Sequence, residues 1–313
     1  MKVEHTSGLT VVRPGMLTTI QDLGRWGRQG QGIPVAGPMD AYSHRYANAL
    51  VGNDEAAAAL EITLIGPVLE ASRDVTCAVT GARFEVSIDG QSVPLDRTFE
   101  VEAGRRIRFG ARGAGARSAL AVRGGFVVSS SYGSRSTSII SRIGPFGGRA
   151  LRSGDELPVG KEPSRSHGLN ADLGLSLPKG GARLRVVEGP HADMFDGSAL
   201  AALYGSRYLV TPSSNRMGYR LEGPMLRHRG PADILSDATP IGSLQVPASG
   251  QPILLMADRQ TTGGYPKIAT VITADLPIAG QLAPGDWIEF HRVSRDEAVA
   301  ALKQQLFRLG AGA

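Results

Sequence analysis

The side chains best suited to chemistry are concentrated in one stretch, residues 257–270, which reads Ala-Asp-Arg-Gln-Thr-Thr-Gly-Gly-Tyr-Pro-Lys-Ile-Ala-Thr. Short apolar runs at 252–256 and 268–272 flank it, and such runs are typical of buried strands. A plain hairpin needs only a turn dipeptide, so this connection carries more polar groups than turning requires. We predict a binding loop held by rigid strands, because binding groups collect on such loops. The alternative is a long hairpin whose polar groups satisfy one another.

Two residues of this stretch are the predicted catalytic groups, Asp258 and Lys267. Asp258 follows a predicted strand and is suited to act as a base or to orient Lys267. The ammonium group of Lys267 can act as a point charge on a carboxylate or phosphate, or as a base if desolvation lowers its pKa.

A second set of residues is predicted to bind the substrate. Arg216 and Arg259 suit bidentate recognition of a carboxylate or phosphate. Gln245 and Gln260 can donate to a carbonyl oxygen, which is an electrostatic contribution of the oxyanion-hole kind. The remaining candidates are polar side chains in glycine-containing stretches: Thr261, Thr262, Tyr265, Gln21, Asp22, Arg25 and Asp40. Such a set suits a small anionic molecule, or an amide or lactam whose carbonyl is polarised.

Two of these features have a structural alternative. Asp40 precedes a stretch with helical periodicity that ends at Gly52, so it is also the expected cap of a helix from residue 40 to about residue 51. Residues 133–137, Gly-Ser-Arg-Ser-Thr, place hydroxyls and backbone amides beside an arginine. This pattern suits either an anion site or a solvated loop.

Several common site types are missing from the sequence. It contains no Gly-x-x-x-x-Gly-Lys-Ser/Thr loop, so any ATP site is not a P-loop site. It also lacks the Gly-x-Ser-x-Gly elbow, the His-Glu-x-x-His zinc motif and the glycine spacing of nicotinamide-binding folds. Its six histidines show no metal-ligand spacing, and no Met-Lys-Met biotinylation site is present. We therefore predict no metal or nicotinamide site, and a chain that is not itself a biotin carrier.

The composition describes a globular protein of mainly β structure. The chain has 313 residues, 42% of them hydrophobic and 20% charged, with 41 glycines and 19 prolines. Many glycines and prolines with few aromatic residues favour short strands and tight turns, with only a few helices. The net charge is +5, but the basic residues are dispersed, so a nucleic-acid partner is not expected.

The cellular compartment of the protein can be predicted from its cysteine content and its hydropathy. The single cysteine, Cys77, lies in an apolar run and makes no disulfide framework. The first residues lack the apolar core of a signal peptide, and no segment reaches transmembrane length. We expect a cytoplasmic protein without a membrane partner.

The strand pattern suggests two related halves. Asp89-Gly90 between alternating runs predicts a β-hairpin. Three short patterns of the first half recur in the same order in the second half, which indicates two β-rich domains of similar plan. We predict an N-terminal domain at 1–160, a linker at 161–182, a C-terminal domain at 183–293, and a helix and tail at 294–313. Ser294 and Glu297 form the capping box of that helix.

Four stretches share the pattern of one family. They are Gly-Met-Leu-Thr-Thr-Ile-Gln-Asp-Leu-Gly-Arg at 15–25 with Gly-Pro-Met-Asp at 37–40, Leu-Glu-Ile-Thr-Leu-Ile-Gly-Pro at 60–67, Asn-Arg-Met-Gly-Tyr-Arg-Leu-Glu-Gly-Pro at 215–224, and the stretch at 257–269. Over residues 11–290 the chain resembles the allophanate hydrolase subunit 2 family. That family includes KipA, the C subunits of 5-oxoprolinases and the second half of the carboxyltransferase domain of urea carboxylase.

The resemblance implies two cyclophilin-like β-barrel domains packed together. It implies, first, one component of an ATP-dependent 5-oxoprolinase, which opens the lactam of 5-oxoproline to glutamate with a sister KipI-like B component and a lactam-utilisation A component. The first alternative is one component of a biotin-dependent carboxyltransferase acting on urea or an amide in the allophanate pathway, with biotin supplied in trans. The second is a KipA-like regulatory protein that binds a partner without turnover.

Overall fold

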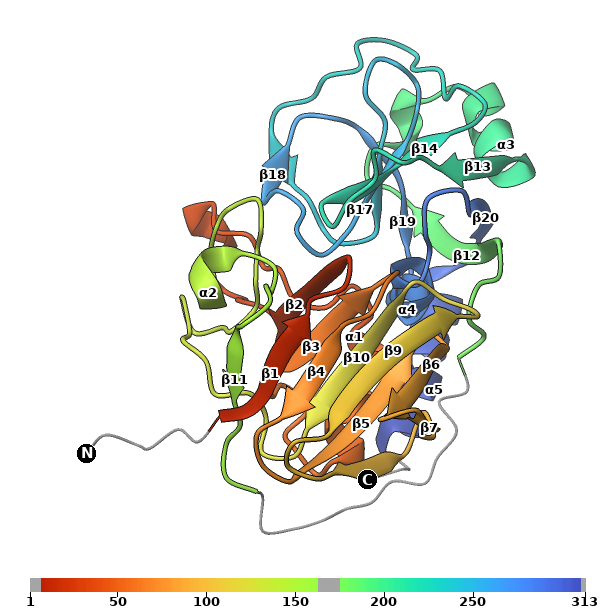
Figure 1. Ribbon diagram of the computed structural model, residues 1–313. Coiled ribbons are helices and arrows are strands. Elements are labelled where there is room, and N and C mark those ends of the chain that lie inside the picture. The colour runs from red at the N-terminus through yellow and green to blue at the C-terminus, as the bar shows by residue number, and fades with distance from the viewer. Residues whose placement is uncertain (1–6, 163–174, 311–313) are drawn as a thin grey trace. The chain divides into compact units, whose positions relative to one another are not determined.

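The computed structural model describes residues 7–162 and 175–310, which fold into two compact units (Figure 1). Unit 1 takes its described residues from Met1–Arg25, Ala36–Leu177 and Leu309–Ala313. Unit 2 takes them from Trp26–Val35 and Pro178–Arg308. The segment Trp26–Val35 therefore belongs with the C-terminal half of the sequence, although we placed it in the N-terminal domain. Most of the predicted linker, 161–182, lies outside the described residues.

Unit 1 contains two antiparallel sheets. The six-stranded sheet has the order β11 (Glu156–Pro158), β1 (Ser7–Arg13), β4 (Val68–Ala71), β9 (Arg106–Arg112), β6 (Phe84–Ile88) and β7 (Gln91–Ser92). The five-stranded sheet has the order β2 (Leu17–Gln21), β3 (Ala59–Thr63), β10 (Arg117–Val122), β5 (Val75–Gly81) and β8 (Thr98–Val101). The helical elements of this unit are α1 (Ala41–Leu50) and the single turn α2 (Pro145–Gly148).

The five-stranded sheet of unit 1 is buried on both faces. Val79 and Leu120 belong to the main core, which also takes residues of the six-stranded sheet such as Leu69 and Ile107. The opposite face carries small residues, including Ala119, and these pack against α1. Because both faces are covered, all six residues of β10 are buried and no alternation of polar residues marks it as a strand.

Two local predictions for unit 1 are confirmed. Asp89 and Gly90 connect β6 to β7 with φ values of 47° and 90°, the positive pair that a type I′ hairpin turn requires. Asp40 is the N-cap of α1, where its side chain accepts from the backbone N–H of Ser43 at 2.9 Å.

Unit 2 is built on a closed seven-stranded barrel. Its strands follow the order β12 (Gly181–Glu188), β19 (Lys267–Val271), β16 (Ser243–Gln245), β17 (Ile253–Leu255), β14 (Gly218–Glu222), β13 (Arg207–Val210) and β20 (Trp287–Arg292). The parallel pair β12–β20 closes the barrel. The other elements are the ribbon of β15 (Asp237–Ala238) with β18 (Thr262–Gly263), the short helices η1 (Gln29–Gln31), η2 (Ala192–Met194), η3 (Thr273–Asp275) and α4 (Leu276–Gly280), and the helices α3 (Gly197–Gly205) and α5 (Arg295–Gly310).

The polar stretch at 257–270 is not a hairpin loop. β17 and β19 flank it as predicted, but β16 lies between them and pairs antiparallel with both. The loop therefore crosses over β16 to connect two strands that run in the same direction. The hairpin alternative is wrong because Ser243–Gln245 supplies the strand that fills the gap.

The mainly β architecture is confirmed, but only one closed barrel is present in the described residues. Unit 1 keeps its strands in two open sheets, so the expectation of two barrels holds for unit 2 alone. The capping box that begins α5 is confirmed, because Glu297 accepts from the backbone and hydroxyl of Ser294 at 2.7 and 2.8 Å. No helix in residues 7–162 or 175–310 is both long and apolar enough to span a lipid bilayer.

Candidate functional site

The outer face of the unit 2 barrel carries a row of three residues on neighbouring strands. Arg220 on β14 pairs with Ile253 on β17, and Ile253 pairs with Gln245 on β16. Side chains alternate across a sheet, so the residues next to these in sequence, such as Tyr219 and Leu254, point into the barrel and are buried. The outward row thus has a charged end, an apolar centre and an amide end.

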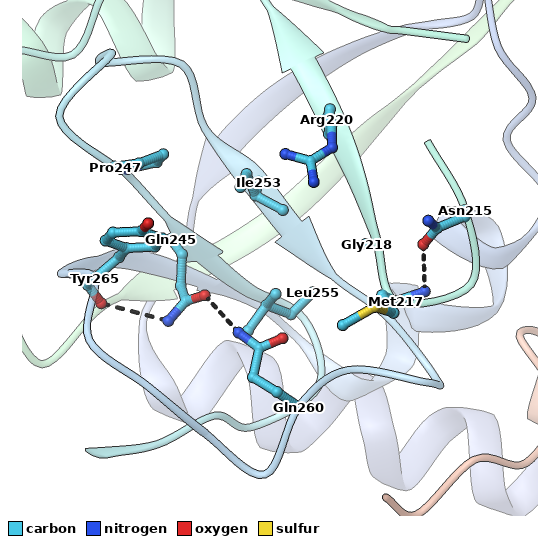
Figure 2. Close-up of a pocket in the computed structure, with 10 residues that line it drawn as sticks. All are labelled: Asn215, Met217, Gly218, Arg220, Gln245, Pro247, Ile253, Leu255, Gln260 and Tyr265. Atoms are coloured by element: carbon cyan, nitrogen blue, oxygen red, sulfur yellow. Dashed lines mark hydrogen bonds between the residues drawn. The ribbon is translucent and has the colours of Figure 1, made fainter. Parts of the chain in front are cut away.

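A cavity of about 390 Å³ lies over this row (Figure 2). Its volume falls within the range of small-molecule sites. The residues that line it come from β14, β16, β17 and the loops beside them: Asn215, Met217, Gly218, Arg220, Gln245, Pro247, Ile253, Leu255, Gln260 and Tyr265. Gln245, Gln260 and Tyr265, three of the predicted substrate-binding residues, are therefore brought together.

Two amides form one wall of the cavity (Figure 2). Gln260 donates from Nε2 to Oε1 of Gln245 at 3.1 Å, and Gln245 donates from Nε2 to the carbonyl of Tyr265 at 3.4 Å. These bonds orient both amide groups. Each Nε2 carries a second N–H, which is available to a carbonyl or carboxylate oxygen of a bound molecule.

A glycine allows this amide pair to form. A Cβ atom added to Gly263 would lie 2.7 Å from Nε2 of Gln245 and 3.1 Å from Nε2 of Gln260. The backbone of Gly263 lies outside the left-handed region, so contact with the amides, and not backbone strain, is what requires glycine here.

A buried ion pair holds the start of the polar loop. Asp258 accepts from Nε and Nη2 of Arg216 at 3.1 and 3.2 Å, and its backbone N–H donates to the carbonyl of Arg216 at 2.8 Å. Both side chains are at most 5% exposed. Sequence reasoning assigned Asp258 as a base or as the partner of Lys267. The structure pairs it with Arg216 at the start of the polar loop.

Lys267 has a different acidic partner. Its Nζ lies 2.8 Å from Oδ2 of Asp237, the exposed first residue of β15, while its side chain is 2% exposed. Its backbone N–H donates to Nδ1 of His191 at 3.2 Å. Burial, followed by the nearby charge of Lys267, lowers the pKa of His191, which keeps the imidazole neutral and able to accept this bond. Neither Asp237 nor His191 was predicted, because no spacing in the sequence links them to Lys267.

Arg259 and Thr261 border a second, smaller cavity of about 230 Å³. Arg259 donates from Nε to the carbonyl of Thr239 at 2.7 Å, and Thr239 donates its hydroxyl to the carbonyl of Gln260. Burial lowers the pKa of Arg259 to about 10, so its guanidinium remains charged at neutral pH. Gln260 lines both cavities, whereas Thr262 pairs with β15 through the backbone and lines neither.

The predicted residues of the first half lie in unit 1, where each makes hydrogen bonds to other residues of that unit. Asp22 accepts from the hydroxyls of Ser134 and Ser136 at 2.6 and 2.7 Å and from the backbone of Arg135 and Gly24 at 2.5 and 2.9 Å. Burial raises the pKa of Asp22, but these four hydrogen bonds outweigh it and hold the pKa below its ordinary value. The anion-site alternative for residues 133–137 is wrong at these hydroxyls, because their protons are donated to Asp22.

The other three candidates of unit 1 are also engaged within it. Arg25 donates to the carbonyls of Ser131 and Ser136. Gln21 donates from Nε2 to the hydroxyl of Thr19 and the carbonyl of Thr137, and Asp40 caps α1.

Comparison with known proteins decides the family. A family model described as "Carboxyltransferase domain, subdomain A and B" matches residues 31–292. The chain belongs to this family. The match confirms the resemblance seen in the four sequence stretches, two of which, 215–224 and 257–269, border the larger cavity.

Individual relatives match over nearly all of the chain, and two of them are 5-oxoprolinase C subunits. The one from Escherichia coli (strain K12) is 41% identical over 297 residues, covering 95% of each chain. The one from Haemophilus influenzae is 38% identical over 280 residues, covering 90% of this chain and 89% of the relative. Urea amidolyase of Saccharomyces cerevisiae is 32% identical over 96% of this chain but only 17% of its own length.

Solved structures of carboxyltransferase family members share the fold. The urea amidolyase of K. lactis has a TM-score of 0.93 and 29% identity, covering all of this chain and 20% of that one. The urea carboxylase of Kluyveromyces lactis has the same TM-score and identity and is covered over 30% of its length. This chain therefore spans only 20–30% of the length of those larger proteins.

Within the described residues, this family member shows no group of three or more His, Cys, Asp and Glu side chains arranged to hold a metal ion. The larger cavity is lined by the amides of Asn215, Gln245 and Gln260, the phenol of Tyr265 and the guanidinium of Arg220. Sequence reasoning missed Arg220, although its place between Tyr219 and Leu221 in an alternating strand is a signal that it faces outward.

Proposed function

We propose that this chain is the C component of a cytoplasmic, ATP-dependent 5-oxoprolinase and takes part in opening 5-oxoproline to glutamate. The observation that carries the proposal is the end-to-end match to two 5-oxoprolinase C subunits, with 95% of both chains covered in the first. The expectation drawn from sequence motifs is borne out by these relatives. We further propose that it works in a hetero-oligomer with a cyclophilin-like, KipI-like B component and a lactam-utilisation A component, and that both of its own units are variants of the cyclophilin-like barrel.

The larger cavity supports a small lactam as the ligand. An attacked lactam carbonyl gathers negative charge on its oxygen, and fixed N–H donors stabilise that charge. The second N–H groups of Gln245 and Gln260 are such donors, and the bonds between the amides hold them in place before a ligand arrives. In this proposal Lys267 contributes positive charge. Its side chain is buried, and Lys267 on β19 pairs with Gln245 on β16.

The direct test is ATP turnover that depends on 5-oxoproline, measured with this chain co-purified with its B and A partners. We expect phosphate and glutamate to be released together, and both to disappear when this chain is omitted. A well-assembled complex without this turnover would contradict the proposal.

Gly263→Ala tests whether the amide pair serves the ligand. The added methyl displaces the amides of Gln245 and Gln260, and we expect kcat/KM for 5-oxoproline to fall by roughly tenfold or more, since small misplacements of binding groups are costly. Gly264→Ala is the matched control, because its nearest neighbour would be the carbonyl of Ile234 at 3.3 Å, away from the amides. Equal kinetics for the two variants would show that the amide pair is not part of the site.

Carboxyl transfer is the second candidate. The family description and the TM-score of 0.93 to a urea amidolyase favour it. In that case the substrate is urea or another amide, and biotin arrives on a separate carrier. Incubation with a carboxylated biotin carrier and urea, followed by loss of the carboxyl group from the carrier, distinguishes this activity from lactam opening. A KipA-like regulatory role predicts partner binding that persists in folded Lys267→Ala and Arg216→Ala variants.

A further inference from the structure

We infer that Arg220 is the residue that recognises the carboxylate of the substrate and so restricts the larger cavity to molecules carrying both a carboxylate and an amide. The inference deepens the proposed function and rests on it for the identity of the substrate, 5-oxoproline. The role of Arg220 itself is inferred from the structure of unit 2.

Arg220 differs from the other arginines on the barrel strands. Each of the others has a carboxylate partner: Arg183 and Arg207 contact Glu289, Arg185 contacts Asp275, and Arg292 contacts Glu188. The guanidinium of Arg220 makes no hydrogen bond or ion pair with any residue in 7–162 or 175–310. Glu222, two residues further along the same face of β14, forms no ion pair with it either.

The backbone of Arg220 is nevertheless held firmly. Its N–H donates to the hydroxyl of Ser214 at 3.0 Å, and its carbonyl accepts from the backbone of Thr211 at 3.0 Å. Arg220 also sits in register with Ile253 across the β14–β17 ladder. A fixed backbone with an uncommitted cation suits a ligand-binding side chain, since its fork of N–H donors matches a carboxylate.

The charge of the cavity is one-sided. Arg220 is the only formally charged residue among the described residues that line it, and none of them is acidic. A carboxylate entering the cavity therefore meets one cation and no repulsive partner. Neutral polar and apolar groups form the rest of the lining. A second charged group on the ligand would therefore find no oppositely charged side chain in the cavity.

The register sets the separation between the two polar ends. Adjacent strands lie about 4.8 Å apart, so the backbones of Arg220 and Gln245, with β17 between them, lie roughly 10 Å apart. Figure 2 shows the guanidinium of Arg220 on one side of Ile253, and the amide of Gln245 on the other side, where it is bonded to Gln260 and to the carbonyl of Tyr265. This arrangement fits a compact molecule with a carboxylate near one end, an amide or lactam carbonyl near the other, and an apolar body between them.

The test compares 5-oxoproline with its neutral carboxamide, which keeps the lactam and lacks the negative charge. In the assembled complex, we expect Arg220→Gln to raise KM for 5-oxoproline about 10- to 100-fold, with a smaller change in kcat, because a charge-assisted hydrogen bond is lost from binding. Arg220→Lys should retain part of the affinity, since it keeps the charge but not the fork. Arg227→Gln, an exposed arginine outside the cavity lining, is the matched control for loss of one charge and should keep the wild-type KM.

Direct binding to the full chain separates this inference from the proposed function. The wild-type chain should bind 5-oxoproline more tightly than the carboxamide, and folded Arg220→Gln should bind the two equally. An unchanged KM and an unchanged preference in that variant would overturn the role of Arg220 while leaving the oxoprolinase intact. If the wild-type complex shows no 5-oxoproline-dependent turnover, the binding comparison is made with succinamate, which carries a carboxylate and an amide, and with succinamide, its neutral counterpart. A wild-type chain that then shows no preference for succinamate overturns the inference as well.

Discussion

Asp258→Asn is expected to lower the free energy of unfolding of unit 2 by about 3–5 kcal/mol, because it removes the negative charge from a buried ion pair with Arg216. The substitution keeps the shape of the side chain and removes only its charge, so packing changes little. The pair is nearly inaccessible to water, with side-chain exposures of 5% for Arg216 and 1% for Asp258. Solvent therefore cannot replace the lost partner.

Tryptophan fluorescence during urea unfolding reports this change, since both tryptophans, Trp26 and Trp287, belong to unit 2. Glu188→Gln is the matched control. It makes the same chemical change in the exposed pair with Arg292 and should cost less than about 1 kcal/mol. The double variant Arg216→Met with Asp258→Leu should recover much of the loss, because both charges of this pair are removed together. A small effect of Asp258→Asn would mean that the pair does not hold the loop.

Gln245→Leu is expected to lower kcat of the assembled complex about 10²- to 10³-fold, the usual effect of removing one donor to a developing oxyanion. Leucine fills a similar volume in a position that is 1% exposed, but it cannot donate to a carbonyl oxygen. KM should change less than kcat, because the interaction strengthens as charge develops on the oxygen.

Gln251→Leu is the control for this variant. The Gln251 side chain bonds only to the backbone of Gly223 in the described structure and lies outside the cavity lining, so its loss should affect stability and leave kcat near the wild-type value. Gln245→Leu with normal kcat, in a chain that still assembles with its partners, would remove this amide from the mechanism.

Much of the site was visible in the sequence because residue types restrict chemistry. Gln245, Gln260 and Tyr265 were predicted from their side chains and meet in one cavity. Arg216 was predicted to bind the substrate and Asp258 to act as a base or to orient Lys267, yet the two side chains bind each other. Side-chain chemistry alone cannot show whether a charge meets a ligand or another residue 42 positions away in the chain.

The fold was predictable where local geometry decides it. Asp40 caps a helix and Asp89-Gly90 makes a turn because each depends on its immediate neighbours. Barrel closure in unit 2, and its absence in the described part of unit 1, depend on pairings between distant strands such as β12 and β20. The position of β16 between β17 and β19 is also a non-local pairing, and three residues of strand give little periodic signal.

Closure of the barrel by β12 and β20 has a consequence for how the protein is made. Gly181, at the start of β12, pairs with Trp287 in the last strand, so a ribosome must synthesise nearly the whole chain before this seam can form. Until then β12 and β13 each lack a neighbour, and open strand edges of this kind invite association with other chains. A nascent chain halted before β20 is thus a natural client for chaperones, and premature stop codons upstream of Trp287 should yield aggregates rather than a partly functional protein.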